Sequence, residues 1–528
     1  MPLSRANVLS AIAMFCLACT ARAVTCPGNP ATVAPATSLQ SLVTACPAGT
    51  TFILQSGTHH DNVTSLKTGD TFTSPSGATI DGVIENGAIT LPLSGQTWTQ
   101  VTIGGTTYWT TPGGTPLSSG SWSSTYCQTA YPSCWYTQDL YFNNVDYIQA
   151  SSLASVTTGA WYYDFAGGDG GVVNNIYLLD NPTSATVELG AYLNAFLSSS
   201  ATNITIQGLI IEKYASNLQD GAVEPETSGW IIKNNEFLLN HGSGIAIHPS
   251  GNNTQVLNNY LHDNGQFGVN AGAVSNLTVS NNTIVHNNID HTHIGFGAGC
   301  CKFTGTNSLV SYNLVHDNLG DGLWSDVFAS GIVYDHNIVY NNQGDGIRLE
   351  ISDRQTVTNN VVYGNGLGSP DETGIKGWQI NGVSSSHVVI LNNYVTNTVG
   401  SLGGAEVTYN SGRGGCGTGC TIPVGTQVQG NYFTVLSGGP MITGVQDFSS
   451  TASSWELAGM WNYNAYCAPT VPWTSTSWVG GSSNSNITFS AWQASGQDLT
   501  STTRAGTCSI PGTALQGAVT MRGTIALQ

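Results

Sequence analysis

Short runs of alternating apolar and polar residues recur along most of this chain. From about residue 201 each run ends at an asparagine, as in WIIKNN, QVLNN and LTVSNN. Successive gaps between these asparagines are 24, 23, 31, 24, 23 and 33 residues, and the asparagines are Asn235, Asn259, Asn282, Asn313, Asn337, Asn360 and Asn393. Strict alternation is typical of half-buried strands, and a fixed period with shared turn residues is typical of a solenoid. The pattern therefore predicts a repeating all-β structure with a period near 24 residues.

A period of this length fits one particular solenoid. At about 3.3 Å per residue, 24 residues make three short strands with their turns, which is one coil of a right-handed parallel β-helix. An asparagine at the same turn of each coil can adopt a left-handed backbone and hydrogen-bond to its copy in the next coil. The two long gaps indicate insertions at residues 287–299 and 366–377. Loops that grow out of a regular solenoid usually rim its binding face.

The whole chain divides into five segments that differ in composition and in the pattern of apolar residues. Residues 1–23 have the basic, apolar and small-residue segments of a secretion signal peptide. We expect an N-terminal cap with a short helix over 38–45, and the first coils, at 24–84. Tryptophans and longer strand-like runs at 85–190 predict an inserted β-rich, sandwich-like module. Residues 191–435 are predicted to form the parallel β-helix, and 436–528 the final coils and a C-terminal cap.

The cysteine pairs indicate the cellular compartment of the protein, and its net charge excludes some classes of binding partner. Beyond the signal segment, ten cysteines fall in close pairs: Cys26/Cys46, Cys127/Cys134, Cys300/Cys301, Cys416/Cys420 and Cys467/Cys508. Such pairs predict disulfides and a secreted or periplasmic protein. Twelve Lys and Arg against 30 Asp and Glu, a net charge of −18, argue against nucleic acid as a partner. No apolar run is long enough to span a membrane, and we expect a monomer.

Two strand-like motifs carry the candidate chemistry. GLWSDV contains Trp324 and Asp326, and GIRLEIS contains Arg348 and Glu350. In period two, Leu323, Ser325 and Val327 face one way, and Trp324 and Asp326 the other. Asp326 and Glu350 are 24 residues apart, one period, which predicts that they lie on neighbouring strands about 4.8 Å apart. Retaining glycosidases hold two carboxyl groups about 5–5.5 Å apart. We therefore predict Asp326 as nucleophile and Glu350 as proton donor.

Further ionisable residues fall in step with this pair. Eleven residues before successive turn asparagines stand Glu224, His248, Ala271, Lys302 and Asp326, with Glu350 one residue out of step. In a chain with only 8% charged residues such a column favours a site over an ordinary solvated face. We predict that Glu224, His248 and Lys302 bind substrate together with Trp324, which can stack on a sugar, and Arg348, which can bind hydroxyls or carboxylates.

Histidines give a weaker signal. His262, His286 and His316 stand before successive turns, and Asp290, His291 and His293 lie in the first insertion. Stacked rings along a solenoid edge are usually structural, and the insertion shows no clear third ligand. We therefore predict no metal site and no cofactor.

These motifs resemble a known group of proteins. GLWSDV and GIRLEIS are similar to motifs of the β-helix glycoside hydrolases of the β-xylosidase type, and GAWYYDF with NIYLLDNP resembles the return from the β-sandwich that interrupts their helix. The resemblance implies a nucleophilic Asp326 and an acid/base Glu350 in the next coil. Val327 replaces an aromatic residue often found there, and Arg348 stands where an apolar or aromatic residue is usual.

Three functions compete at this stage. The first is a retaining glycoside hydrolase acting on a neutral plant or microbial polysaccharide or oligosaccharide. The second is a polyuronate lyase or C5-epimerase, in which Lys302, Arg348 and His248 would neutralise a carboxylate and abstract a proton. The third is a non-catalytic carbohydrate-binding or surface β-helix, since fold alone does not decide activity.

Overall fold

A computed structural model describes residues 24–77, 81–118, 122–167, 170–370, 376–397, 400–410, 422–436, 443–447, 458–468, 474–475, 487–506 and 508. The predicted signal peptide and the Cys416/Cys420 pair lie outside these ranges. The other four predicted cysteine pairs form disulfides: Cys26–Cys46, Cys127–Cys134, Cys300–Cys301 and Cys467–Cys508. In the described part of the chain, no helix is both long and apolar enough to cross a bilayer.

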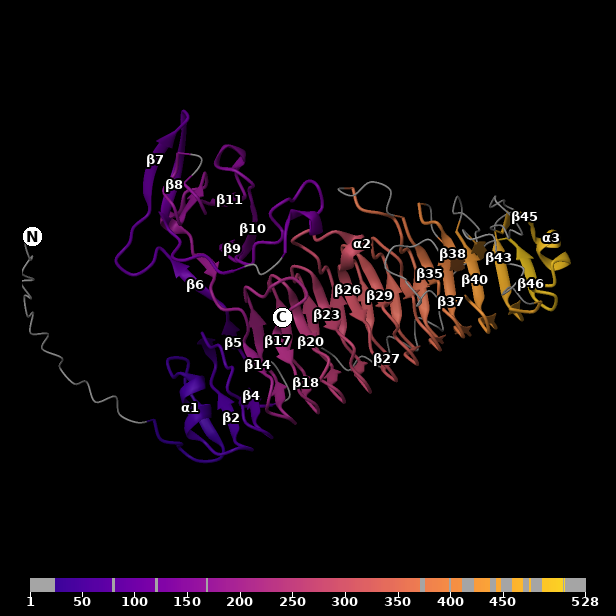
Figure 1. Ribbon diagram of the computed structural model, residues 1–528, viewed down its shortest axis with the longest axis horizontal. Helices are drawn as coiled ribbons and strands as arrows, with labels where there is room; N and C mark the ends of the chain where they lie inside the picture. The colour runs from indigo at the N-terminus through magenta and orange to yellow at the C-terminus, as the bar shows by residue number, and fades with distance from the viewer. Residues whose placement is uncertain are drawn as a thin grey trace, which may run out of the picture.

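Three parallel sheets wind along one axis and confirm the predicted β-helix (Figure 1). Among the described residues, sheet A has thirteen strands, from β1 (Ala31–Val33) to β42 (Trp461–Asn462). Sheet B also has thirteen, from β3 (Gly57–His59) to β46 (Thr502–Ala505). From β15 (Thr205–Gln207) to β41 (Gly444–Asp447), successive strands belong to sheets A, B and C in that order. Every neighbour in these sheets is thus the strand of an adjacent coil.

Sheet C is the sheet that carries the candidate chemistry. Its ten described strands are, in order, β14 (Phe196–Ser198), β17 (Gly221–Pro225), β20 (Ser243–Ile247), β23 (Phe267–Ala271), β26 (Gly299–Phe303), β29 (Asp321–Ser325), β32 (Ile347–Glu350), β35 (Trp378–Val383), β38 (Gly403–Tyr409) and β41 (Gly444–Asp447).

The core lies inside the coils and is built from stacked apolar residues. In sheet A the in-register inward column contains Ile232, Val256, Val279, Val310, Tyr334, Val357 and Ile390. All of these side chains are fully buried. Complete burial of one such aliphatic side chain stabilises a fold by about 1.5–3 kcal/mol. The alternation read from the sequence is therefore the inside–outside alternation of these strands.

Asparagines at the corner between sheets A and B form the predicted ladder. Asn235 Nδ2 donates to Asn259 Oδ1 at 3.1 Å, and each further asparagine repeats the contact as far as Asn464. The ladder residues are buried. The left-handed backbone belongs instead to the preceding residue, such as Asn234 (φ 57°) or Asn258 (φ 55°). In a pair such as Asn234 and Asn235, the first asparagine thus forms the left-handed turn and the second forms the ladder hydrogen bonds.

A second ladder at the corner between sheets B and C was not predicted. It begins with Asn240 donating to Asn264 Oδ1 at 2.9 Å and ends with Asn365 donating to Gln379. Each member stands five residues after a member of the first ladder, as Asn240 does after Asn235. The two ladders fix both edges of sheet B. The insertion at 287–299 and the described ends of the second insertion, at 366–370 and 376–377, lie between a strand of sheet B and the next strand of sheet C.

Short helices lie at three places along the solenoid. α1 (Leu39–Ala45) begins at Ser38, whose side chain accepts a hydrogen bond from the Ser41 N–H, and its buried Leu39, Leu42 and Val43 join the core at the N-terminal end. This agrees with the predicted helix. α2 (Ile294–Gly297) lies in the first insertion, and α3 (Phe489–Ala494) lies near the C-terminal end with Trp492 buried in the core.

An eight-stranded sheet interrupts the solenoid and stands beside its N-terminal coils (Figure 1). Its order is β6 (Ala88–Leu91), β13 (Val187–Gly190), β9 (Leu140–Phe142), β10 (Val145–Gln149), β11 (Ala160–Tyr163), β12 (Asn175–Leu178), β8 (Thr106–Pro112) and β7 (Thr99–Ile103). We call residues 88–190 the inserted module. β5 (Val83–Asn86) still belongs to sheet B, so the interruption begins three residues later than predicted.

The inserted module is one sheet folded over a shared core. The parallel pairing of β10 with β11 joins two antiparallel groups of four strands. One hydrophobic cluster contains Leu140 and Leu189 from the first group and Trp161 and Ile176 from the second. The two groups therefore pack face to face as in a sandwich, although their hydrogen bonding is continuous.

Candidate functional site

Two outward columns on sheet C hold the predicted site residues. The first runs through Ala246, Asn270, Lys302, Trp324 and Arg348, which are direct partners on successive strands. Glu224 precedes Ala246 in this column, because Val223 pairs with Ile245. The second column stands two residues further along each strand and contains His248, Gly272, Thr304, Asp326 and Glu350. Asp326 and Glu350 are thus in step with each other.

The prediction that Glu224, His248, Lys302 and Asp326 form a single column was therefore wrong, because these residues belong to two columns. Glu224 and Lys302 lie 11 residues before Asn235 and Asn313, whereas Ala246 and Trp324 lie 13 before Asn259 and Asn337. The corner between sheet C and the ladder varies in length, so counting back from the ladder does not follow the strands. Ala271, placed in the column by that count, is an inward core residue.

The orientation predicted for Val327 was also wrong. β29 ends at Ser325, and Val327 is half exposed with a left-handed backbone (φ 48°) instead of continuing the inward series of Leu323 and Ser325. Ile351, one coil later and directly after Glu350, has the same backbone (φ 47°). The chain turns sharply after each candidate carboxyl group, at a β-branched residue that rarely adopts this conformation.

Trp324 is flanked by two cations. Lys302 Nζ lies 3.9 Å and Arg348 Cζ 4.8 Å from the indole ring centre, and the two residues come from the strands on either side of β29. The ring is only 1% exposed. Cation–π contacts of this kind contribute about 0.5–2 kcal/mol. In this geometry Trp324 separates and positions the two cations and presents no free face to a sugar.

Each candidate catalytic carboxyl group is bound by one of these cations. Asp326 Oδ2 lies 3.0 Å from Lys302 Nζ, and its Oδ1 accepts the Val327 N–H at 2.7 Å. Glu350 Oε1 accepts a hydrogen bond from Arg348 at 2.7 Å. Asp326 is 5% exposed and Glu350 is fully buried. The two carboxyl groups are held in fixed positions by charge-assisted hydrogen bonds.

Arg348 is shared with two further acids that sequence reasoning missed. Its guanidinium donates to Asp321 at 3.2 Å and lies 3.9 Å from Asp345. Burial raises the pKa of Asp321 to about 7, against the lowering effect of Arg348, and burial also raises the pKa of Asp345. One guanidinium thus faces three carboxyl groups, of which Asp321 keeps its proton up to about neutral pH. The signal was visible as Gly-Asp-Gly at the start of β29 and again directly before β32.

The next two coils extend the acidic cluster. Asn381 pairs with Arg348 and donates to Asp345 Oδ2 at 3.0 Å, and Glu406 pairs with Asn381. Burial raises the pKa of Glu406 to about 8, although a hydrogen bond from Thr408 opposes the shift. Sequence reasoning missed Asn381 and Glu406 as well, because the second insertion lengthens the coil between Arg348 and Asn381 and hides their pairing.

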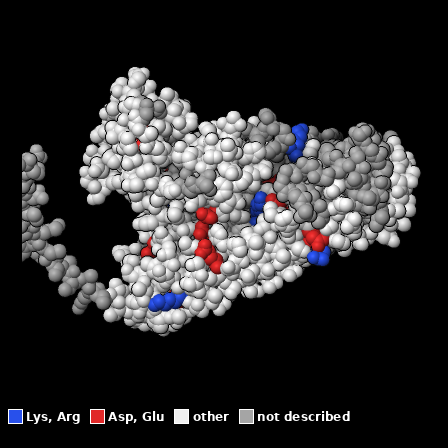
Figure 2. Space-filling model, in the orientation of Figure 1, with Lys and Arg blue, Asp and Glu red and all other residues white. Residues whose placement is uncertain are grey.

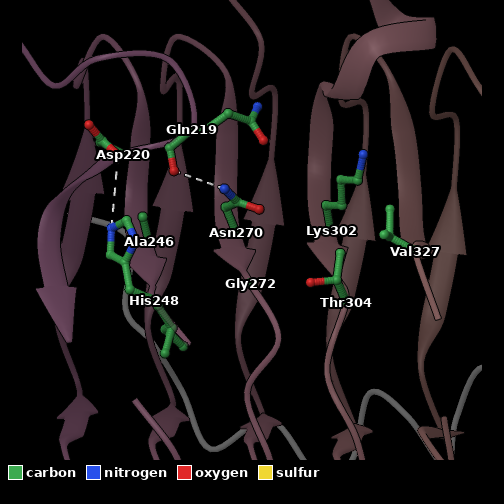
Figure 3. Close-up of a pocket in the computed structure, with 10 residues that line it drawn as sticks. Gln219, Asp220, Ala246, His248, Asn270, Gly272, Lys302, Thr304 and Val327 are labelled. Carbon is green, nitrogen blue, oxygen red and sulfur yellow. Dashed lines mark hydrogen bonds and ion pairs between the residues drawn. The ribbon is translucent and has the colours of Figure 1, made fainter. Parts of the chain in front are cut away.

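A pocket of about 330 Å³ lies beside this cluster, over β20, β23 and β26 (Figure 3). It is lined by Gln219, Asp220, Ala246, Ile247, His248, Asn270, Gly272, Lys302, Thr304 and Val327. His248 Nε2 lies 3.9 Å from Asp220 and 3.8 Å from Glu224. Burial, followed by the charge of Asp220, raises the pKa of Glu224 to about 8. Figure 2 shows that charged side chains are sparse on the face in view and gather near its middle.

The predicted residues thus fall into two adjoining groups. Lys302, Trp324, Asp326, Arg348 and Glu350 form one cluster. Glu224 and His248 lie at the pocket, and Lys302 belongs to both groups. α2 borders the shared edge, since Lys302 Nζ also donates to the Phe296 carbonyl at 3.5 Å.

Comparison with known proteins agrees with the fold. Residues 168–298 and 220–395 match the family model of the right-handed β-helix region, which is less than half of the chain. The solved structure of XylC in complex with xylose has a TM-score of 0.55 and 15% identity, over 81% of this chain and 80% of that chain. The A-module of the mannuronan C-5 epimerase AlgE6 of Azotobacter vinelandii has a TM-score of 0.46 and 14% identity, over 90% and 94% of the two chains, and we draw no conclusion from it. No curated protein matches the sequence. The chain therefore forms a right-handed parallel β-helix interrupted by an inserted β-module.

Proposed function

We propose that this protein is a secreted carbohydrate-active enzyme, a retaining glycoside hydrolase with Asp326 as nucleophile and Glu350 as acid and base. The observation that carries the proposal is the register of β29 and β32. Trp324 pairs with Arg348 and Ser325 with Leu349, so Asp326, directly after β29, and Glu350, the last residue of β32, stand at equivalent positions in neighbouring coils. Strands in a sheet are about 4.8 Å apart, and retaining glycosidases need a carboxyl separation of about 5–5.5 Å.

The surrounding charges suit the two roles. Lys302 lies 3.0 Å from Asp326 Oδ2 and holds this carboxyl group in a fixed position, as a nucleophile requires. Glu350 belongs to a cluster in which three carboxyl groups share Arg348, and burial raises the pKa of one of them, Asp321, to about 7.

The reaction takes two steps. Glu350 gives its proton to the glycosidic oxygen while Asp326 attacks the anomeric carbon, so the leaving sugar departs and a glycosyl ester forms. The Glu350 carboxylate then takes a proton from water, whose oxygen attacks the same carbon and releases Asp326. The two inversions leave the anomeric configuration unchanged.

Substrate must reach carboxyl groups that cations now cover. Lys302 and Arg348 have long side chains, and we propose that both turn toward the sugar hydroxyls on binding, which uncovers Asp326 and Glu350. The half-exposed Val327 and exposed Phe328 directly follow Asp326 and offer an apolar contact to the sugar. The shared fold with XylC, solved with xylose, is compatible with a sugar ligand.

The test is a panel of neutral polysaccharides and aryl glycosides, followed by reducing-end release, ultraviolet absorbance of unsaturated products and the anomeric configuration of the first product by NMR. New reducing ends with retained configuration support the proposal. An inverted product, or binding without turnover across the panel, would overturn it.

A second candidate rests on the pocket, which lies over His248 and Lys302 and not over Asp326 and Glu350. A lyase or epimerase would use Lys302 to neutralise a uronate carboxylate and His248 to abstract its C5 proton. Ultraviolet-absorbing products from a polyuronate, lost in His248→Gln but retained in Asp326→Asn, would favour this function. The scarcity of Lys and Arg in the whole chain argues against it.

A further inference from the structure

Four ionisable side chains meet where the inserted module rests on the solenoid. Asp139 and Asp146 come from the inserted module, His241 from the corner before β20, and Asp290 from the insertion at 287–299. We call them the junction cluster. None of them takes part in the reaction proposed above.

The surrounding contacts hold the three segments together. Gln128 N–H donates to the His291 carbonyl at 2.9 Å, and His293 N–H donates to the Tyr126 carbonyl at 2.8 Å. The ring of Tyr131 stacks on that of His291 with 3.5 Å between centres. The arm that carries the Cys127–Cys134 disulfide is thereby fixed against the insertion, and the four side chains meet at a defined place.

The oxygens of Asp139 and Asp290 converge on one nitrogen of His241. Nδ1 lies 3.0 and 3.1 Å from the two oxygens of Asp139, and 3.0 Å from Asp290 Oδ2. A ring nitrogen carries at most one proton, so one N–H cannot serve both carboxylates well. Two ligands at right angles around an ion at about 2.1 Å stand about 3.0 Å apart. The observed spacing is that of a hydrogen bond and equally that of neighbouring ligands in an octahedral metal site.

Burial makes the cluster costly without a cation. His241 is 1% exposed, and the side chain of Asp290 is 7% exposed. Within the described residues, Asp290 Oδ2 and Asp146 Oδ1 are buried and receive no well-formed hydrogen bond, and Asp290 Oδ2 shares the His241 nitrogen with Asp139. Converging carboxylate oxygens of this kind form a donor set that a metal ion can bind. A bound cation would satisfy the three carboxylates at once.

A glycine makes the approach of these groups possible. A side chain at Gly265 would collide with Asp290 Oδ2 and with the His241 carbonyl oxygen. Asp290 N–H also donates to the Gly265 carbonyl at 3.2 Å. Asp290 can thus sit directly over the coil that carries His241 only because residue 265 has no side chain.

We propose that Asp139, His241 and Asp290 bind a divalent transition-metal ion, Mn²⁺ or Zn²⁺, with Asp146 at its edge, and that the ion fastens the inserted module and the first insertion to the solenoid. An imidazole nitrogen among carboxylate oxygens suits these ions better than Ca²⁺, which takes oxygen ligands. The sequence shows no clear third ligand near Asp290 because the other proposed ligands are distant along the chain. Asp139 and His241 are 102 residues apart.

Two other groups of one histidine and two acids occur in the described residues: His59, Asp61, Glu85 and Asp220, Glu224, His248. The second is wider, since His248 Nε2 lies 3.8–3.9 Å from both carboxylates. In the first, Asp61 already accepts the Leu39 N–H and His59 Nε2 already contacts the Gln55 carbonyl. Of the three groups, the junction cluster is the one whose members join the inserted module, the solenoid and the first insertion.

The experiment uses the full chain with any purification tag removed. Metal content is measured by mass spectrometry, and chelator-treated protein is titrated with MnCl₂ or ZnCl₂ by calorimetry while its Tm is recorded. We expect about one ion per chain and a rise in Tm on binding. Asp290→Asn and His241→Gln should each weaken binding at least about 10-fold.

His286→Gln is the matched control, because His286 also contacts an aspartate, Asp263, but on the exposed surface. It should bind the ion as the parent does. Should chelator-treated parent protein take up neither ion and keep its Tm, the proposal is wrong, and this measurement does not depend on any variant folding. Equal binding by parent and Asp290→Asn would also overturn it.

Discussion

Trp324 and Arg348 are direct partners across β29 and β32, and the guanidinium carbon of Arg348 lies 4.8 Å from the centre of the indole ring. This one pairing sets the register of both motifs. It brings Asp326 and Glu350 into step and places Trp324 between the two cations that bind them.

Replacement of Trp324 tests its role as a spacer. Trp324→Leu leaves a cavity and removes both cation–π contacts, so we expect the urea midpoint to fall, with a loss of about 2–4 kcal/mol. Trp324→Phe keeps a ring face and should lose less. Because Lys302 and Arg348 then lose their positions, kcat should fall further than KM changes. A normal kcat in Trp324→Leu would contradict the positioning role.

Removal of the proposed nucleophile gives the most direct test of the reaction. Asp326→Ala should lower kcat/KM on an aryl glycoside by at least about 10³-fold, because no carboxylate remains to attack the anomeric carbon. Added azide should restore part of the rate and yield a glycosyl azide. Asp335→Asn, a change at a surface acid on sheet A, should leave the rate unchanged. Full activity in Asp326→Ala would exclude the assignment.

Glu406 predicts a pH dependence of stability. Burial raises its pKa to about 8 in the folded chain, so the folded state binds this proton more tightly than the unfolded state does. The resulting stability is present below the usual pKa of about 4.5 and is lost as pH rises to about 8. Glu406→Gln should match the parent near pH 5 and exceed it at pH 8, by on the order of a few kcal/mol. Parallel urea midpoints across this range would refute the prediction.

The first asparagine ladder predicts a sharp difference between adjacent residues. Asn259 donates to Asn282 Oδ1 and to the Ile232 carbonyl and accepts from Asn235, all in the core, so Asn259→Ala should cost about 2–4 kcal/mol. Asn258 is exposed with φ 55°, a conformation that glycine adopts freely, so Asn258→Gly should cost little. Thermal or urea unfolding of both variants checks the pair. Similar losses in both would show that the ladder does not carry the stability assigned to it.

The repeat was readable from the sequence because every coil marks the same corner with the same residue. Asn235 and its copies reveal both the period and the direction of stacking, and the apolar alternation before them reveals the inward face. The second ladder, at Asn240, had an equally regular signal that was overlooked.

The site was harder to predict for two physical reasons. The corner after sheet C varies in length, which shifted Glu224 and Lys302 by one column relative to Asp326. Contacts between the inserted module and the solenoid, such as Asp139 with His241, join residues that no period relates. Local chemistry was still visible: Lys302, Trp324, Asp326, Arg348 and Glu350 do meet on one face.

The two asparagine ladders also constrain how this molecule can change in size. Each ladder residue forms hydrogen bonds with the equivalent asparagines of the coils before and after it. Insertion or deletion of part of a coil would leave a buried amide without its partner, whereas insertion or deletion of a whole coil would preserve the contact. Growth and shortening are therefore expected in steps of one complete coil. The addition of a whole coil would lengthen the outer surface of sheet C while the packing of the existing core stays the same.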